Sequence, residues 1–371
     1  MLAIFFFHNA HLFDFIDWHI KNKQQSFWAT AFVAFVHLWS MPLLFLLAGA
    51  STWFARRYKT GTQYIAERFK RLVVPFVIGL FIIVPPQIYI EGLSKSQFKG
   101  SFFQLYPHLF AKDVITFDPQ VFSNYGHHLW FLAFLFIFSL MDLPISGCLR
   151  KATGQRFVSW IAAFIEKPGN IFLAVIPVAL IQILLRVKFP AYCSWTDFWY
   201  WFVFFIYGYL IMADQRLIKA IQKQGLTGLI IGIGCLFMIG YLYLADDFAN
   251  WLIHPQFSFV YILFMFLYSL AAWAWVVFIL SLGIRFLQFN HRLLEYSNEA
   301  ILPFYILHQT VILLIGFYVV QWNLSVMSKY LLISASSLVV IVSLYEVFIR
   351  RVNFIRICFG LKPKRIPKKW D

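Results

Sequence analysis

Residues 28–91 hold two long apolar runs joined by a basic turn, WATAFVAFVHLWSMPLLFLLAGASTWFARRYKTGTQYIAERFKRLVVPFVIGLFIIVPPQIYIE. Each run reaches the roughly 20 residues that a helix needs to cross the ~30 Å hydrocarbon core of a bilayer. The turn at 55–71 carries six lysines and arginines, whereas the flanking runs are almost free of charge. The pattern predicts two membrane-spanning helices whose connection lies on the side where basic loops gather.

The composition of the whole chain extends this pattern. Of its 371 residues, 61% are hydrophobic and only 13% are charged, about half the charged share of a soluble domain. The fold class predicted is therefore an all-α polytopic membrane bundle of about ten transmembrane helices. The expected spans are 1–16, 28–54, 71–91, 128–148, 170–186, 197–213, 226–245, 258–282, 299–320 and 329–349.

The basic residues predict the orientation of the bundle. With these spans, 23 of the 31 lysines and arginines fall on the side that holds the 55–71 turn. The positive-inside rule then puts both termini and this turn in the cytoplasm. We expect a membrane domain over 1–350 and a basic cytoplasmic tail over 351–371, whose end, 365–371, would lie on the lipid surface. Juxtamembrane charge of this kind indicates lipid headgroups and gives no support for nucleic acid as a partner.

Two connections have an expected character of their own. The inner segment 152–168 is predicted to be an amphipathic interfacial helix. The long outer connection at 92–127 either has a function, as long loops often do, or is a lid or re-entrant segment with only a packing role.

His8, His37 and His308 fall inside predicted spans, where an ionisable group is costly and therefore a candidate for function. His8 and His308 are expected near the middle of the bilayer, and an imidazole there can serve as a general base at neutral pH. A bridging hydrogen bond between two helices would explain either histidine equally well. His37 has apolar neighbours and is expected to be structural. Asp142 and Glu346 lie near cytoplasmic ends and are expected to reach water there.

The first predicted span carries further polar residues beyond His8. His11 is one helical turn further on, and Asp14 and Asp17 would continue the same face of a continuous helix. Two imidazoles and two carboxylates suit a metal. A polar outer helix end explains them as well, and we expect no metal.

Within the basic turn, Arg68 and Arg71 are three residues apart at the entry to the next span. On an α-helix their guanidinium groups would share one face and could grip phosphate oxygens. Arg56, Arg57 and Lys59 are expected to be lipid-facing charge.

The motifs, taken in order, resemble those of the acyltransferase 3 family of membrane acyltransferases. The likeness covers nearly the whole chain. It looks closest to the family's glucan-biosynthesis branch of succinyltransferases, through the stretch RLVVPFVIGLFIIVPPQIYI. The other points of likeness are AIFFFHNA at 3–10, PLLFLLAGA at 42–50, ERFKRLVVPF at 67–76, HHLWFLAFLFIFSL at 127–140 and PFYILHQTVI at 303–312.

The resemblance implies a location in a bacterial inner membrane, an activity and a set of site residues. The family moves an acyl group from cytoplasmic acyl-CoA, such as acetyl-CoA or succinyl-CoA, to a hydroxyl of an extracytoplasmic glycan or small molecule. His8 matches the family's catalytic histidine and His308 its late-span histidine, which would orient His8 or bind the oxyanion. Arg68 and Arg71 match its Arg-x-x-Arg pair, which suits CoA phosphates. Only seven residues precede His8, so the arginine that the family places about eleven residues earlier has no counterpart, and we expect a misassigned start or a truncation.

A second class of function fits the same residues. A transporter or flippase for a polar solute or lipid-linked sugar would also use polar groups at the midplane. The chain shows no inverted repeat, which speaks against that alternative. Four aromatic residues near the outer face could stack on a carbohydrate acceptor or form an interfacial belt: Trp18, Trp195, Tyr200 and Trp201. The sequence does not indicate an oligomeric state.

Overall fold

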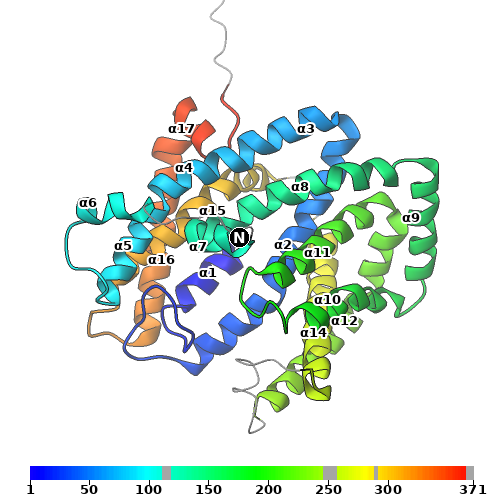
Figure 1. The fold of residues 1–371 in the computed structure, drawn as a ribbon, viewed down its shortest axis with the longest axis horizontal. Coiled ribbons are helices and arrows are strands. Elements are labelled where there is room, and N and C mark those ends of the chain that lie inside the picture. Colours follow the sequence, from blue (N-terminus) through cyan, green and yellow to red (C-terminus); the bar gives the residue numbers. More distant parts are fainter. Residues whose placement is uncertain (111–117, 245–256, 288–290, 365–371) are drawn as a thin grey trace, which may run out of the picture.

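The computed structural model describes residues 1–110, 118–244, 257–287 and 291–364, and every regular element in these ranges is helical (Figure 1). Helices satisfy all their backbone hydrogen bonds internally, which a bilayer core requires of any segment that crosses it. The all-α membrane fold expected from the sequence is confirmed.

Eight helical segments among the described residues are long and apolar enough to cross a membrane. One further apolar segment, Asn170–Leu185, contains η4 (Asn170–Ala174) and α10 (Val175–Leu185) and is shorter. The eight long segments are α2 (Phe27–Tyr58), Gly61–Ser94, Gln120–Leu149, α11 (Trp195–Ala213), α12 (Gln215–Tyr243), α14 (Phe259–Phe286), α15 (Arg292–Val319) and Val326–Ile349. Nine of the ten predicted spans thus have a helical counterpart.

Three of these segments are built from successive shorter helices. Gly61–Ser94 comprises α3 (Gly61–Arg68), η1 (Phe69–Val73), α4 (Val74–Ile82) and α5 (Val84–Ser94). Gln120–Leu149 comprises α7 (Gln120–Gly126), η3 (His127–Leu129) and α8 (Trp130–Leu149), and Val326–Ile349 comprises α16 (Val326–Leu344) and η5 (Tyr345–Ile349). The long outer connection holds α6 (Phe102–Leu105) and η2 (Tyr106–Phe110), and residues 111–117 lie outside the described ranges.

The first predicted span, 1–16, is wrong in length. Helix α1 covers only Leu2–Ala10, and the chain then folds back without regular structure until α2 begins. Backbone bonds close this segment, from Asn22 to the Leu12 carbonyl (2.8 Å) and from Ser26 to the Phe13 carbonyl (2.7 Å). The Asp14 carboxylate also accepts from the backbone N–H of Ile16 at 3.2 Å, a local turn that competes with helix. Asp14 and Asp17 therefore do not continue a helical face from His8.

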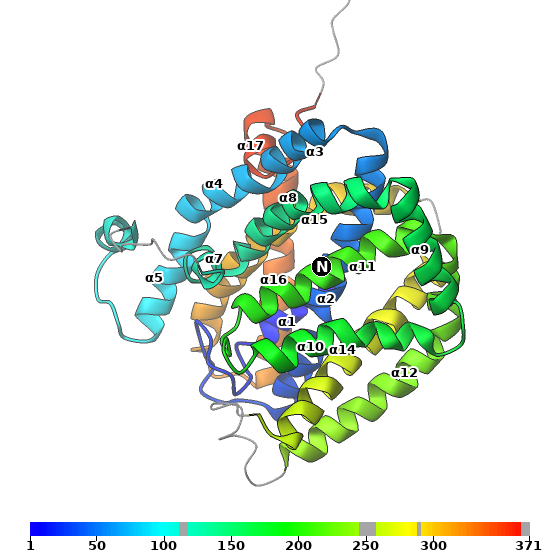
Figure 2. The ribbon, with the colours of Figure 1, turned by 45° about the vertical axis from the view of Figure 1, so that its right-hand side comes forward.

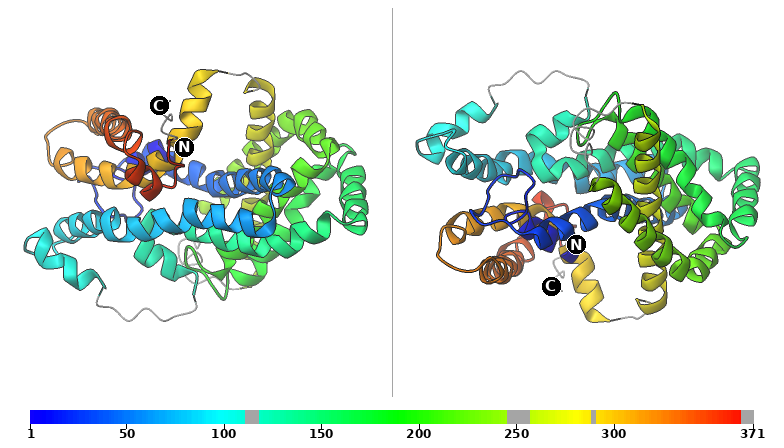
Figure 3. Two further views of the ribbon diagram at one scale, coloured as in Figure 1. Left: turned by 90° about the horizontal axis from the view of Figure 1, so that it is seen from above. Right: turned by 90° about the horizontal axis from the view of Figure 1, so that it is seen from below.

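Helix α1 lies in the middle of the bundle, in contact with α2, α15 and α16. Helices α16 and α17 (Asn353–Cys358) stand on one side of the bundle, and α9 (Ala152–Ile165), α10 and α12 on the other, in both Figures 1 and 3. The short first helix is thus placed where the two halves of the molecule meet.

Helices α2 and α11 approach each other more closely than side chains would permit. A Cβ atom on Gly49 would stand 1.8 Å from the Phe205 carbonyl oxygen, and one on Gly208 would stand 1.8 Å from that of Leu46. Glycine at these two positions lets the backbones touch, as small residues do at interfaces between membrane helices.

Helix α9 runs along the edge of the bundle (Figure 2) and confirms the expected amphipathic segment. Phe157, Trp160 and Phe164 are exposed along one face, with neighbouring rings stacked. The tail is partly folded: α17 packs on α4, and Arg356 forms an ion pair with Glu299 at 2.6 Å. The expected lipid-surface anchor at 365–371 lies outside the described residues.

Candidate functional site

His8 and His308 lie together at the core of the bundle. His8 comes from α1 and His308 from the middle of α15, and their ring centroids are 5.0 Å apart. His308 is completely buried and His8 is half-buried. Two histidines 300 residues apart in the sequence therefore form one group. His8, His308 and His128 are together called the histidine centre.

Each of these two imidazoles has one ring nitrogen left over. His8 Nδ1 and His308 Nε2 are buried and have no hydrogen-bond partner among the described residues. The Nδ1 of His308 lies 2.5 Å from the Tyr305 carbonyl oxygen, which can only accept, so Nδ1 carries the proton. In that tautomer Nε2 of neutral His308 has a free lone pair that accepts a proton or a hydrogen bond. Buried unpaired polar atoms are rare in proteins, and each calls for an explanation such as a bound water, an ion, a ligand or a catalytic role.

His128 is a third member of the centre that the sequence did not single out. Its ring lies 5.2 Å from that of His308, edge to face. Its Nε2 donates to the Ile306 carbonyl at 3.1 Å, and Gln87 donates to its Nδ1 at 3.4 Å. Both ring nitrogens are thus occupied, which suits a positioning residue. In the sequence, His128 belongs to the HHLW start of an apolar run. This pattern does not indicate which distant residue His128 contacts.

Side-chain amides and hydroxyls tie the surrounding helices together. Gln87 of α5 donates to the Thr310 hydroxyl at 2.7 Å, and Thr310 in turn donates to the Ile83 carbonyl at 2.8 Å. Gln309 donates to Gln87 Oε1 at 3.0 Å. This connected set fixes α15 against α5 next to His308, and connected polar networks of this kind hold their members in one arrangement.

An ion pair in the segment after α1 holds His11 in place. His11 Nδ1 lies 2.8 Å from Asp14 Oδ2, and Lys21 pairs with the other carboxylate oxygen. Burial acts to raise the pKa of Asp14, but the hydrogen bonds from His11 and Lys21 outweigh it and hold that pKa below its ordinary 3.8. With both oxygens of Asp14 paired, and with Asp17 exposed and paired to Lys95 at 3.1 Å, the His8–His11–Asp14–Asp17 set does not converge on a common point.

Trp18 covers the two histidines of the N-terminal segment. Its ring stacks on His8 at 5.7 Å and on His11 at 5.2 Å, with interplanar angles of 19° and 23°. A stacked indole shields one face of each imidazole from water.

A second group of potential ligands lies beside the centre. One ligand atom each of His19, Glu91 and His127 falls within 4.8 Å of the others. His19 Nδ1 lies 2.5 Å from Glu91 Oε2, and Gln309 donates to its Nε2 at 3.1 Å. Lys95 pairs with the other Glu91 oxygen at 3.0 Å. Protein groups therefore already occupy both nitrogens of His19 and both oxygens of Glu91, and a cation would have to displace them.

The basic turn differs from its expected geometry. Residues 69–73 form a π-helical turn, in which three residues cover less of a turn than in an α-helix, so Arg68 and Arg71 do not stand directly above one another. Arg68 donates to the Thr52 and Ser51 hydroxyls at 3.1 and 3.2 Å, whereas the Arg71 side chain is exposed. The expected two-pronged fork is thus replaced by one anchored and one exposed guanidinium.

Arg71 and the helix that carries His308 both lie against Gly360. A Cβ atom on Gly360 would stand 2.5 Å from the Arg71 carbonyl oxygen and 2.8 Å from Leu302 Cδ2, so both residues lie against Gly360. Leu302 precedes His308 by six residues, which is about 9 Å along a helix. Gly360 therefore lies between the basic turn and the helix that carries His308.

Two sequence-based expectations about charged residues are wrong. Arg56 is buried and donates to Ser146 at 3.4 Å, so it is not lipid-facing. Asp142 is buried as well, because α8 is covered at this level, and does not reach water. His37, which the sequence predicts to be structural, lines a cavity beside Tyr192 at a ring distance of 5.5 Å.

The fold and the site define a class: a multi-pass helical membrane protein with a buried cluster of imidazoles at its core. A family model described as an acyltransferase domain matches residues 1–346. The chain thus belongs to the acyltransferase 3 family, in agreement with the resemblance of its motifs, and the family favours a membrane acyltransferase over a transporter.

Curated relatives point in the same direction. The chain is 24% identical to the glucans biosynthesis protein C of Salmonella schwarzengrund (strain CVM19633) over 370 residues, covering 96% of this chain and 91% of the relative. The proteins of the same name from Salmonella heidelberg (strain SL476) and Salmonella typhi are 23% identical with the same coverage. No solved structure matches the chain.

Proposed function

We propose that this membrane acyltransferase moves an acyl group from cytoplasmic acyl-CoA to a hydroxyl of an extracytoplasmic glycan or small molecule. The observation that carries the proposal is the pair of buried imidazoles, His8 and His308, each with an unpaired ring nitrogen. A thioester is already activated, so the enzyme has to hold the two substrates and move one proton.

In the proposed reaction the acceptor hydroxyl gives its proton to His8, and its oxygen attacks the thioester carbon. The carbon–sulfur bond breaks as the carbon–oxygen bond forms. The proton then passes to the CoA thiolate, which leaves as the thiol, and no other reactant is consumed.

The tautomer of His308 favours one of the two roles considered for it. With Nδ1–H held by the Tyr305 carbonyl, Nε2 of the neutral ring accepts. It can therefore orient His8 by taking a hydrogen bond from it, whereas binding an oxyanion would require His308 to be protonated. We assign His308 to orienting His8.

The donor is assigned to the basic end of the bundle. Arg71 is exposed there, and Arg68 stands beside it on the Ser51 and Thr52 hydroxyls. Guanidinium groups suit CoA phosphates. From this end, the thioester would have to reach about half of the ~30 Å membrane core to meet His8.

The test uses His8→Ala in vesicles with isotope-labelled acyl-CoA. Removal of a general base is expected to lower transfer by about 10²- to 10⁴-fold. His108→Ala, which changes an exposed histidine of the outer connection, is the control and is expected to match the native protein. Undiminished transfer by His8→Ala would remove His8 from the reaction.

A further inference from the structure

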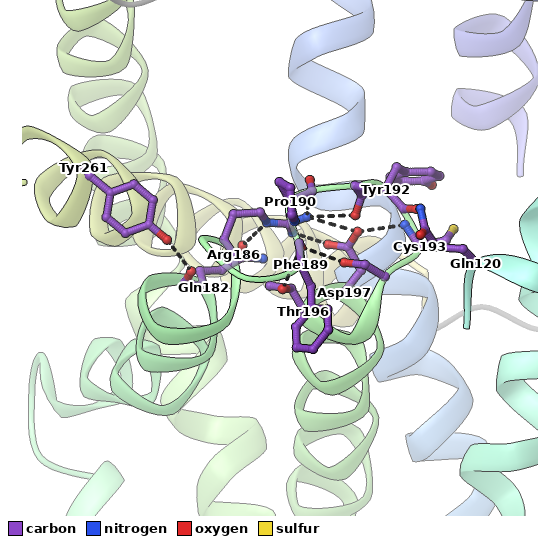
Figure 4. Close-up of polar contacts among 12 residues, drawn as sticks. Gln120, Gln182, Arg186, Phe189, Pro190, Tyr192, Cys193, Thr196, Asp197 and Tyr261 are labelled. Carbon is purple, nitrogen blue, oxygen red and sulfur yellow. Dashed lines mark hydrogen bonds and ion pairs between the residues drawn. The ribbon is translucent and has the colours of Figure 1, made fainter. Parts of the chain in front are cut away.

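A cavity of about 310 Å³ lies between α2, α10, α11 and α14. It stands next to the 186–195 connection, at the end of the bundle that holds the segment after α1 and the 92–127 connection, opposite the basic turn. Gln120, at the end of that outer connection, donates to the Tyr192 carbonyl at 3.4 Å (Figure 4). The volume of the cavity is at the lower end of the range for small-molecule sites.

Ring contacts connect the cavity to the histidine centre. The Phe7 ring lies 5.0 Å from that of His8 and stacks on His37, a cavity residue, at 6.3 Å. On the other side Trp130, two residues after His128, stacks on Trp201 at 4.7 Å. A molecule that touches His37 in the cavity would thus be separated from His8 by the rings of His37 and Phe7.

The charges at the cavity compensate each other. Asp197 is 5% exposed, pairs with Arg186 through both oxygens and accepts from the Cys193 backbone N–H at 2.9 Å (Figure 4). Arg186 also donates to Gln182 Oε1 at 3.0 Å. A site with a closed ion pair and no surplus charge disfavours an ionic ligand such as acyl-CoA, and favours a neutral one.

Tyr200 provides an unused hydrogen-bonding group. Its side chain is 2% exposed and lines the cavity, yet its buried hydroxyl has no hydrogen-bond partner among the described residues. Such a hydroxyl calls for a polar ligand, since a lipid tail in the cavity would leave it unpaired. The other walls include the rings of Trp201, Tyr192 and Tyr268, together with aliphatic side chains such as Leu38, Met41 and Pro42.

Aromatic faces beside a neutral hydrogen-bonding group suit a sugar ring, which has apolar C–H faces and a rim of hydroxyls. We propose that the cavity binds one neutral sugar unit of the acceptor, with the Tyr200 hydroxyl bonded to a hydroxyl of that unit. This inference rests on the proposed function and names where the acceptor sits. It also separates Tyr200 and Trp201 from an interfacial aromatic belt, because both side chains are buried rather than turned to lipid.

The test has a binding arm that needs no catalysis. The purified full-length protein in nanodiscs is dialysed to equilibrium against radiolabelled methyl β-glucoside and a β-linked glucose disaccharide, without acyl-CoA. Saturable binding is expected. Tyr200→Phe should weaken it about five- to tenfold, the effect of one hydrogen bond, and Met41→Trp, which places an indole in the cavity, should abolish it.

The matched control is Tyr207→Phe on the same helix, whose hydroxyl donates to the Ala174 carbonyl at 2.7 Å outside the cavity. It is expected to bind like the native protein. Thermal midpoints of all variants check that each one is folded.

A kinetic arm separates this inference from the proposed function. In Tyr200→Phe the KM for the acceptor should rise while the KM for acyl-CoA stays constant. Acceptor KM and sugar binding unchanged in both Tyr200→Phe and Met41→Trp would overturn the inference and leave the proposed function intact. Saturable sugar binding without any acyl transfer by the native protein would overturn the proposed function and leave the inference intact. Absence of sugar binding by the native protein would overturn the inference.

Discussion

The histidine centre and the basic turn both gather polar side chains in an apolar protein, but they hold them in opposite ways. At the centre, buried imidazoles are fixed by neighbours and still have two ring nitrogens unpaired. At the turn, Arg68 is satisfied by hydroxyls, and Lys59 pairs with Glu67. At the turn the protein itself supplies partners for these two charged groups, whereas the two unpaired nitrogens at the centre have no partner among the described residues and can bind a ligand. A change at the centre should therefore cost chemistry, and a change at the turn should cost binding.

The largest expected effect on catalysis comes from a substitution at His308. We expect His308→Ala to lower kcat by about 10²- to 10³-fold, because His8 loses the group that orients it. The KM for acyl-CoA should stay nearly constant, because the substitution lies far from the basic turn. Steady-state transfer with labelled acyl-CoA measures both values.

His108→Ala is again the control for that experiment. Equal kcat values for His308→Ala and the control would mean that the unpaired nitrogen of His308 has no part in the reaction.

The frame around the centre should matter for stability as well. Asp14→Asn removes a buried carboxylate that pairs with both His11 and Lys21, and loss of one partner of a buried ion pair costs about 3 kcal/mol. Thermal unfolding in detergent should show the loss.

Asp17→Asn serves as the comparison variant, because its carboxylate is 82% exposed and its pair with Lys95 should contribute less than about 1 kcal/mol. If the two variants unfolded at the same temperature, the ion pair of Asp14 would not support the centre.

Substitutions in the basic turn are expected to change the KM for acyl-CoA. Arg71→Ala is expected to raise the KM for acyl-CoA about tenfold with little loss of stability, since Arg71 is an exposed residue. Arg68→Ala should raise KM and also lower the thermal midpoint, because it removes two hydrogen bonds to α2.

Arg57→Ala changes a neighbouring exposed arginine and should leave KM as it is. An unchanged KM in the Arg68→Ala, Arg71→Ala double variant would move the donor site elsewhere.

A smaller effect is expected from pH. Because the pKa of Asp14 in the folded protein is below its ordinary 3.8, the ionised carboxylate stabilises the fold above about pH 4, and this contribution is lost as pH falls through the folded pKa. The difference in thermal midpoint between the native protein and Asp14→Asn should thus be full at pH 7 and shrink towards pH 3. A difference that stayed constant over this range would contradict the ion-pair account.

Sequence patterns alone predicted the membrane class, nine of the helical spans, the amphipathic α9 and the candidate residues His8, His308, Arg68 and Arg71. These follow from local properties: the length of apolar runs, the position of basic loops and the order of motifs. The errors of this prediction were also local in origin. It extended α1 through Asp14 because apolar residues continue there, and it placed Arg68 and Arg71 on regular α-helix.

Which distant residues meet depends on how helices from different parts of the chain pack, and it is seen in the three-dimensional structure alone. This packing produces the contact of His8 with His308, the hydrogen bond from Gln87 to His128, the burial of Asp142 and the cavity around Tyr200. Hydropathy and spacing carry no information on such pairings, because any polar residue inside a span has the same cost until a neighbouring helix supplies, or withholds, its partner.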